Sequence, residues 1–194
     1  ENSFTDRNFD NISYEKINAV KDYYFQGIKR FKINEKFLTD KAPLNFKWIG
    51  FIKKIFPSAK IIHCKRDPMD VCYSNFKNSF QSYSLSFSYN MKKLGDYYNL
   101  YEDLISFWNK KYPNEIYNLY YEDLINDQKN QKENLLKFCN LDWDENCLSP
   151  HKNNKFVATA SLAQVRSPIY KSSIKKWKNF ENELSDLKKI VIKN

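Results

Sequence analysis

Residues 59–76 read AKIIHCKRDPMDVCYSNF, and this stretch indicates the fold because a strand pattern passes directly into a helix pattern. The apolar run Ala59–Cys64 predicts a buried strand. Asp67 is a typical N-cap residue and Pro68 takes the favoured first position of a helix, so a helix is predicted from Pro68 through Phe76. A strand that leads at once into a helix is typical of an α/β fold.

The rest of the sequence continues this alternation. Helices are predicted where apolar residues recur at intervals of three or four, and strands where short apolar runs occur. In chain order, the further predicted elements are helices over 13–31, 48–56 and 94–108, a strand over 116–121, a helix around 135–139, and helical pieces over 173–180 and 184–192. This order predicts an α/β fold with a mainly parallel sheet.

The composition is that of a folded, basic protein. Of the 194 residues, 42% are hydrophobic and 17% aromatic, which argues against a disordered chain, and no apolar run is long enough to predict a membrane span. The net charge of +9 favours an anionic partner, although lysines spread along the whole chain are more typical of a solvated surface. The short lysine clusters at 53–54 and 175–178 resemble ordinary helix faces, so nucleic acid is not an expected partner.

The cysteines and histidines do not form a recognisable metal site. Cysteines occur at 64, 72, 139 and 147 without a CxxC pair, and the histidines at 63 and 151 do not complete a zinc spacing. Free thiols are the simplest interpretation, and a disulfide stays open. His63 lies inside the apolar strand, where a packed core histidine is expected rather than a catalyst.

Arg66 is the strongest candidate for an anion site. It follows the predicted strand, at the edge of a parallel sheet where ligands gather, and the next helix begins there with its positive dipole end. Ser74 lies two helical turns after Asp67 and therefore on the same helix face. Arginine and serine could hold one phosphate between them. The alternative is an ion pair between Arg66 and Asp70, with a buried serine hydroxyl.

Several motifs, taken in order, resemble the sulfotransferase superfamily. The likeness is strongest to its bacterial branch that is often fused to tetratricopeptide repeats and is related to tyrosylprotein sulfotransferases. The motifs that carry it are Thr39–Phe46, Ile61–Pro68 with Ser74, Tyr120–Leu124, Leu141–Trp143, and Thr159–Tyr170 with Trp177. They cover nearly the whole chain.

The resemblance implies a P-loop-like, three-layer α/β fold whose first strand and glycine-containing loop are missing, so that residues 1–194 form the C-terminal part of a single sulfotransferase domain. It implies transfer of a sulfuryl group from 3'-phosphoadenosine 5'-phosphosulfate (PAPS) to an acceptor hydroxyl, leaving adenosine 3',5'-bisphosphate. The acceptor is a peptide or protein tyrosine, a carbohydrate or a small molecule. The alternative is a non-catalytic or truncated nucleotide-binding or interaction module of the same fold.

The resemblance also implies residue roles. Arg66 and Ser74 match the residues that bind the 3'-phosphate, Lys41 matches the catalytic lysine beside the sulfuryl group, and Tyr121 matches the tyrosine that contacts adenine. Further cofactor-binding residues are expected in the segment that closes over the nucleotide: Ser161, Gln164, Val165, Arg166 and Lys171. The alternatives are a solvated lysine for Lys41, a core sheet residue for Tyr121 and a surface charge for Arg166.

Other expectations follow from what the family has and this sequence lacks. The general base is expected upstream of Glu1, so these 194 residues alone should have little or no transferase activity, whether they are a fragment or a decayed paralogue. An upstream tetratricopeptide-repeat region is an expected partner. Bacterial relatives imply a cytoplasmic location, whereas tyrosylprotein relatives in animals work in the Golgi lumen.

Overall fold

The computed structural model describes residues 12–31, 36–80, 82–152 and 174–192. The chain forms two compact units that divide between Ala59 and Lys60. Within the described ranges, no helix is both long enough and apolar enough to cross a bilayer.

The first unit is helical. Helix α2 spans Tyr14–Lys29 and begins where the Ser13 hydroxyl accepts a hydrogen bond from the backbone N–H of Lys16. The 3-10 helix η1, Pro43–Trp48, leads into α3, Ile49–Ile55. The rings of Tyr24 and Phe25 pack against the ring of Phe56, with centroids 5.1 Å and 5.8 Å away. The helices predicted over 13–31 and 48–56 are therefore confirmed.

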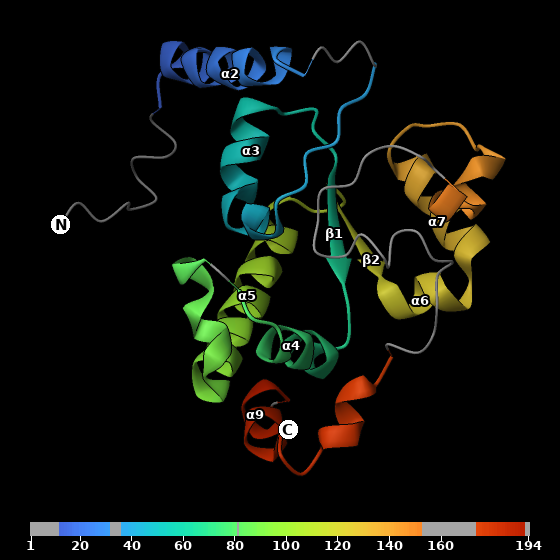
Figure 1. Cartoon of the computed structure of the whole chain (residues 1–194). Coiled ribbons are helices and arrows are strands. Elements are labelled where there is room, and N and C mark those ends of the chain that lie inside the picture. The colour runs from blue at the N-terminus through green and yellow to red at the C-terminus, as the bar shows by residue number, and fades with distance from the viewer. Residues whose placement is uncertain (1–11, 32–35, 81, 153–173, 193–194) are drawn as a thin grey trace. The chain divides into compact units, whose positions relative to one another are not determined.

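The second unit is built on two parallel strands, β1 at Ile61–Lys65 and β2 at Ile116–Tyr120 (Figure 1). Their register pairs Ile61 with Ile116 and Lys65 with Tyr120, so the carboxyl ends of both strands meet at one edge. Helix α5, Met91–Lys111, contacts one face of the pair, and α7, Gln128–Phe138, contacts the other. A small parallel sheet between helices confirms the predicted α/β class.

A helix begins immediately after each strand. Helix α4, Pro68–Lys77, follows β1, and the carboxylate of Asp67 accepts a hydrogen bond from the N–H of Asp70, as expected of an N-cap. Helix α6, Tyr121–Asn126, follows β2. Tyr121 was predicted as the last residue of a strand, but it is the first residue of α6, so the tyrosine lies at the strand–helix junction and not within the sheet.

The prediction that β1 is a buried strand is wrong for most of its length. His63 is 8% exposed, whereas Ile62 is 40% exposed and Cys64 is also exposed. Ile62 and Cys64 are on the sheet face that α7 contacts. Helix α7 packs on the β2 side of this face, where Phe138 contacts Tyr117, and so leaves the β1 side uncovered by α7. An apolar run predicts a strand but does not predict how much of it is covered.

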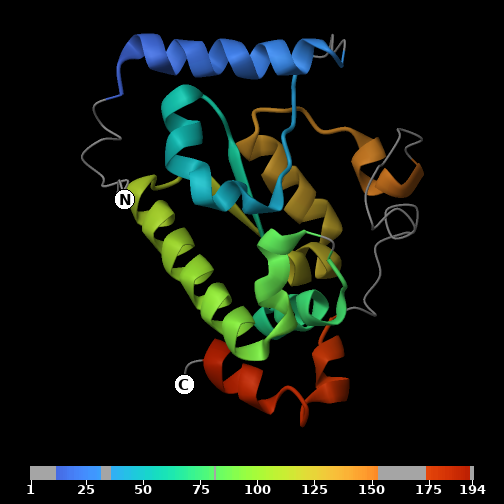
Figure 2. The same cartoon turned by 60° about the vertical axis from the view of Figure 1, so that its left-hand side comes forward.

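The core of the second unit lies where α4 and α5 meet the C-terminal helices, η5 at Lys176–Phe180 and α9 at Ser185–Val191 (Figure 2). Its buried members are Met69, Cys72, Leu94, Tyr98, Trp177, Leu184, Leu187 and Val191. The remaining short helices are η2 at Tyr83–Tyr89, η3 at Glu145–Leu148 and η4 at Pro150–Lys152. The two predicted C-terminal helical pieces are thus present and cover the core.

Gly95 allows α9 to approach the backbone of α5. A Cβ at this position would lie 2.7 Å from Cγ2 of Ile190, which is closer than carbon atoms can pack, and 3.0 Å from Cβ of the same residue. The amide of Asn99 donates a hydrogen bond of 3.0 Å to the carbonyl of Ile190 in the same contact. Glycine is therefore required at 95 for this helix pair to be in contact.

Candidate functional site

Arg66 lies between β1 and α4, at the carboxyl edge of the sheet. Its guanidinium carbon is 5.1 Å from the ring centroid of Tyr121, the first residue after β2. This distance is within the range of a cation–π contact. The structure therefore brings together two of the residues that the sequence analysis assigned to nucleotide binding.

Arg66 also forms the ion pair that was considered as the alternative to phosphate binding. Its Nη2 lies 3.5 Å from Oδ2 of Asp70, whose side chain is fully buried, while 25% of the Arg66 side chain remains exposed. A guanidinium has five N–H donors in a planar fork, and the ion pair with Asp70 involves one of its nitrogens, Nη2. The ion pair is present, and it leaves part of the arginine in contact with solvent.

Ser74 lies on α4 and is partly buried. It follows Asp70 by four residues, so the two side chains are neighbours on one face of the helix. Asp70 is the residue of this face that pairs with Arg66. The pairing of Ser74 with Arg66 on one phosphate stays a prediction.

The backbone N–H groups at the start of α4 are less available to an anion than the sequence suggested. The N–H of Asp70 donates to the carboxylate of Asp67, and the N–H of Asp67 donates to Oε1 of Glu122 at 2.9 Å. Glu122 thus links the turn after β2 to the turn after β1. The carboxylates of Asp67, Asp70 and Glu122 lie at this helix end, so of the two anion-binding features predicted here, the arginine and the helix terminus, the terminus is the less suited to an anion.

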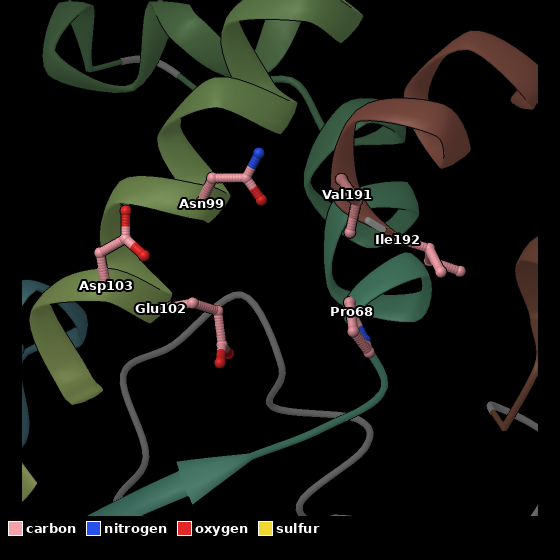
Figure 3. Close-up of a pocket in the computed structure, with 6 residues that line it drawn as sticks. All are labelled: Pro68, Asn99, Glu102, Asp103, Val191 and Ile192. Carbon is pink, nitrogen blue, oxygen red and sulfur yellow. The ribbon is translucent and has the colours of Figure 1, made fainter. Parts of the chain in front are cut away.

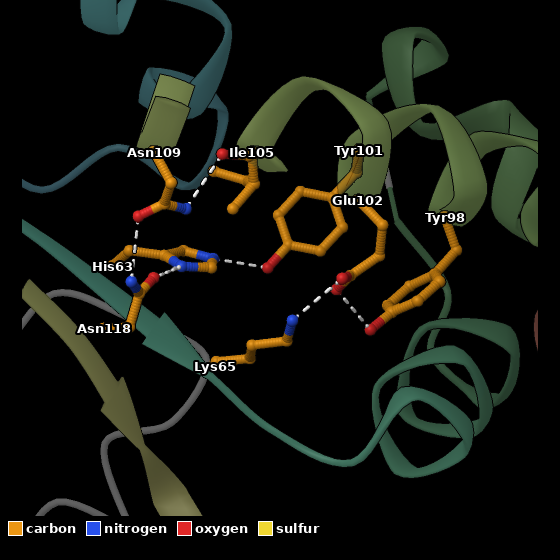
Figure 4. Close-up of polar contacts among 8 residues, drawn as sticks. All are labelled: His63, Lys65, Tyr98, Tyr101, Glu102, Ile105, Asn109 and Asn118. Atoms are coloured by element: carbon orange, nitrogen blue, oxygen red, sulfur yellow. Dashed lines mark hydrogen bonds and ion pairs between the residues drawn. The ribbon is translucent and has the colours of Figure 1, made fainter. Parts of the chain in front are cut away.

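A second polar cluster joins β1 to α5 (Figure 4). Lys65 forms an ion pair with Oε2 of Glu102 at 2.8 Å, and Oε1 of Glu102 accepts a hydrogen bond from the hydroxyl of Tyr98, also at 2.8 Å. Burial and the neighbouring Glu102 carboxylate raise the pKa of Tyr98, which keeps its phenol protonated. Lys65 is therefore turned to α5, while Arg66 is turned to Asp70 and Tyr121.

His63 belongs to a partly buried chain of hydrogen bonds on the sheet face that α5 contacts. Its Nδ1 lies 2.7 Å from Oδ1 of Asn118, and the amide of Asn118 donates to Oδ1 of Asn109 at 2.9 Å. This order makes Nδ1 the protonated nitrogen of a neutral ring and leaves Nε2 to accept from the hydroxyl of Tyr101. The histidine is packed and fully hydrogen-bonded, as expected of a structural residue.

The folded protein should lose stability when His63 is forced to take up a proton. Burial, as the largest cause, lowers the pKa of His63 below its usual 6.5. Between the two pKa values the unfolded chain therefore binds more protons than the folded one. The contribution of the neutral, buried His63 to the free energy of unfolding is complete above pH 6.5 and is lost as the pH falls through the lower pKa of the folded state. We expect urea unfolding to show a slope of up to about 1.4 kcal/mol per pH unit in that window.

The slope should disappear in His63→Gln. The matched control is His151→Gln, which removes the other histidine of the chain. The comparison uses the change in unfolding free energy with pH and not the absolute stability, because the variant loses hydrogen bonds as well. A wild-type slope that persists in His63→Gln would contradict the assignment.

A cavity of about 370 Å³ lies beside the first residue of α4 (Figure 3). It is lined by Pro68, Asn99, Glu102, Asp103, Val191 and Ile192. Arg66 and Ser74 do not belong to this lining, and its carboxylates, Glu102 and Asp103, repel a phosphate. The cavity is therefore separate from the predicted anion site.

Lys41 belongs to the first unit, where it is exposed. It follows Asp40, whose carboxylate accepts hydrogen bonds from the hydroxyl of Tyr24 at 3.0 Å and from the amide of Asn45 at 3.4 Å. Lys41 and Asp40 line a wide groove of about 880 Å³ beside α2, together with aromatic and aliphatic side chains such as Phe31. An exposed lysine at a groove fits a catalytic role and a solvated one equally well.

The other predicted nucleotide contacts, Ser161, Gln164, Val165, Arg166 and Lys171, lie outside the described residues. They stay predictions from the sequence. All four cysteines are free thiols, so the disulfide that the sequence left open does not form. Burial raises the pKa of Cys72 to about 12, which makes this thiol unreactive.

Comparison with known proteins decides the family. The model of the sulfotransferase family matches residues 5–145. The chain belongs to the sulfotransferase family. Lys41, Arg66, Ser74 and Tyr121 all lie within the matched part of this sulfotransferase-family chain.

A relative from Aquifex aeolicus (strain VF5), named only as an uncharacterized protein, is 32% identical to this chain over 177 residues. The alignment covers 90% of the sulfotransferase-family chain and 23% of the relative. The chain therefore spans about a quarter of the length of the curated relative it matches.

Two residues beside Arg66 and Tyr121 have no role in the prediction from sequence. Asp70 appears there only as the alternative partner of Arg66, and Glu122 has no role. Glu122 directly follows Tyr121 within the motif Tyr120–Leu124, which was a local signal for its position. The hydrogen bonds that Asp70 accepts from Lys175 and Trp177 join distant segments, which no local pattern indicates.

Proposed function

We propose that this protein binds PAPS through the carboxyl edge of its sheet and belongs to an enzyme that transfers the sulfuryl group to an acceptor hydroxyl. Membership of the sulfotransferase family supports sulfuryl transfer. The observation that carries the donor assignment is the contact between Arg66 and Tyr121, which places a cation and an aromatic ring side by side where the two strands end.

The chemistry of this pair suits an adenosine 3'-phosphate. The Arg66 guanidinium is partly exposed and can form charge-assisted hydrogen bonds to phosphate oxygens. Ser74, one helical turn after Asp70 on α4, would add a hydroxyl donor to the same phosphate. Tyr121 is partly buried and offers an aromatic surface on which a flat base can pack. The residues present therefore fit the 3'-phosphate and adenine of the donor.

Lys41 is proposed to act at the reacting end of the donor. Sulfuryl transfer requires the acceptor hydroxyl to lose a proton and attack sulfur while the bond from sulfur to the 5'-phosphate oxygen breaks. A lysine is a compact cation that offsets the charge developing on the departing oxygen. PAPS supplies the sulfuryl group, and the side chains of this protein bind and orient it. The acceptor is proposed to be a hydroxyl compound, with protein tyrosine as the first class to test.

The proposal is tested by measuring equilibrium binding of adenosine 3',5'-bisphosphate and of adenosine 5'-monophosphate to the 194-residue chain. The two ligands differ only in the 3'-phosphate, so we expect clearly tighter binding of the bisphosphate. Equal affinities would contradict the donor site. Incubation of the chain with radiolabelled PAPS and tyrosine peptides follows. Transfer would support an enzyme and would contradict the expectation that these residues alone are inactive, whereas nucleotide preference without transfer is the result expected both of part of an enzyme and of a non-catalytic module.

A further inference from the structure

Asp70 is a fully buried carboxylate that joins the turn after β1 to a distant segment of the second unit, Lys175–Trp177. Its Oδ2 lies 3.5 Å from Nη2 of Arg66 and accepts a hydrogen bond of 2.6 Å from the backbone N–H of Lys175. Its Oδ1 accepts a second bond, of 3.5 Å, from the N–H of Trp177. A buried charge is costly unless it is paired and hydrogen-bonded, and this one is both.

The position of the Asp70 carboxylate is fixed without help from Arg66. Its neighbours Met69 and Cys72 belong to the core, and so does Trp177, which donates one of its hydrogen bonds. Lys175 adopts a left-handed backbone conformation with φ of 57°, which is uncommon for a residue with a side chain. Such a conformation persists where the surroundings hold it, and the hydrogen bond to Asp70 is one such contact.

Arg66, in contrast, depends on its contacts for its direction. Arginine has a long side chain with many rotamers, and its five donors have a fixed planar geometry. Asp70 holds Nη2, and the ring of Tyr121 lies 5.1 Å from the guanidinium carbon. Both neighbours contact the guanidinium and so constrain the orientation of the plane that a phosphate has to meet.

We infer that Asp70 is a positioning residue, which orients Arg66 for the 3'-phosphate and joins it to the segment at Lys175–Trp177. This inference rests on the proposed function. It opposes a simple electrostatic expectation, because a carboxylate beside the arginine weakens the attraction for an anion. If orientation matters more than charge, removal of the Asp70 charge weakens phosphate binding; if charge matters more, it strengthens binding.

The test is the ratio of the dissociation constants for adenosine 5'-monophosphate and adenosine 3',5'-bisphosphate in the wild-type chain and in Asp70→Asn. We expect this ratio to fall by about tenfold, corresponding to the loss of one hydrogen bond to a charged group. The matched control is Asp96→Asn, which removes an exposed aspartate from an i,i+4 ion pair with Lys92. The control should leave the ratio unchanged.

A purely structural role for Asp70 would reduce binding of both nucleotides together and leave their ratio intact. In an Arg66→Ala background, Asp70→Asn should have no further effect on the ratio, because it acts through the arginine. A ratio that stays constant or rises in Asp70→Asn overturns the inference. A wild-type ratio near one instead overturns the proposed function, and with it the role of Asp70.

Arg66→Lys provides a test that does not require Asp70→Asn to fold. Lysine keeps the positive charge and can still pair with Asp70, but it lacks the planar fork that needs orienting. We expect Arg66→Lys to lose most of the preference for the bisphosphate. Full preference in this variant would show that the orientation of the cation is unimportant and would overturn the inference.

Discussion

Arg66→Ala is expected to weaken binding of adenosine 3',5'-bisphosphate by about 10- to 100-fold and to leave binding of adenosine 5'-monophosphate almost unchanged. A hydrogen bond to a charged group contributes about 1.5–3 kcal/mol, and 1.4 kcal/mol corresponds to a tenfold change in affinity. The selective loss follows because Arg66 is assigned to the 3'-phosphate alone. Isothermal titration calorimetry with both nucleotides measures it directly.

Arg30→Ala is the matched control for this experiment. Arg30 is an exposed arginine whose guanidinium carbon lies 4.7 Å from the ring centroid of Phe31, so the control removes the same charge and a similar ring contact. It should change neither affinity. Because Arg66→Ala also leaves Asp70 without its ion pair, thermal unfolding of the variant is measured alongside. Equal losses for both nucleotides, or equal losses in both variants, would contradict the assignment of Arg66.

Leu187→Ala is expected to destabilise the second unit by about 2–5 kcal/mol, the usual cost of truncating a buried leucine. Leu187 is fully buried on α9, and its Cδ1 is 3.4 Å from the position that a Cβ on Gly95 would take. Truncation therefore opens a cavity at the contact between α9 and α5. Urea unfolding followed by circular dichroism gives the change in unfolding free energy.

Leu100→Ala makes the same chemical change on the surface of α5. Leu100 is 67% exposed, so its truncation should alter the unfolding free energy by no more than about 0.5 kcal/mol. If the two variants were equally stable, α9 would not be packed against α5 in solution.

The sequence predicted the strands, the main helices and the turn between β1 and α4 because each depends on neighbouring residues. Asp67 caps α4 and Pro68 begins it, as the local pattern indicated. Tyr121 was misplaced because aromatic residues favour strands, and Ile116–Tyr121 reads as one continuous run. Where a strand ends within such a run depends on the helix that follows, here α6.

The contacts that define the candidate site could not be predicted in the same way. The hydrogen bond from Asp67 to Glu122 joins residues 55 positions apart, and the one from Lys175 to Asp70 joins residues 105 positions apart. Arg66 has a nearby partner, Asp70, that the spacing of four residues did suggest. The spacing did not indicate that Asp70 is buried. Burial is what distinguishes this ion pair from an ordinary surface pair, because it fixes the carboxylate that contacts the arginine.

The packing of η5 and α9 against α4 couples residues that are far apart in the sequence. Trp177 packs in the core and donates its backbone N–H to Asp70, so a substitution that displaces Trp177 would move the partner of Arg66. Variants in these C-terminal helices therefore report on the turn after β1 although they do not touch it in sequence.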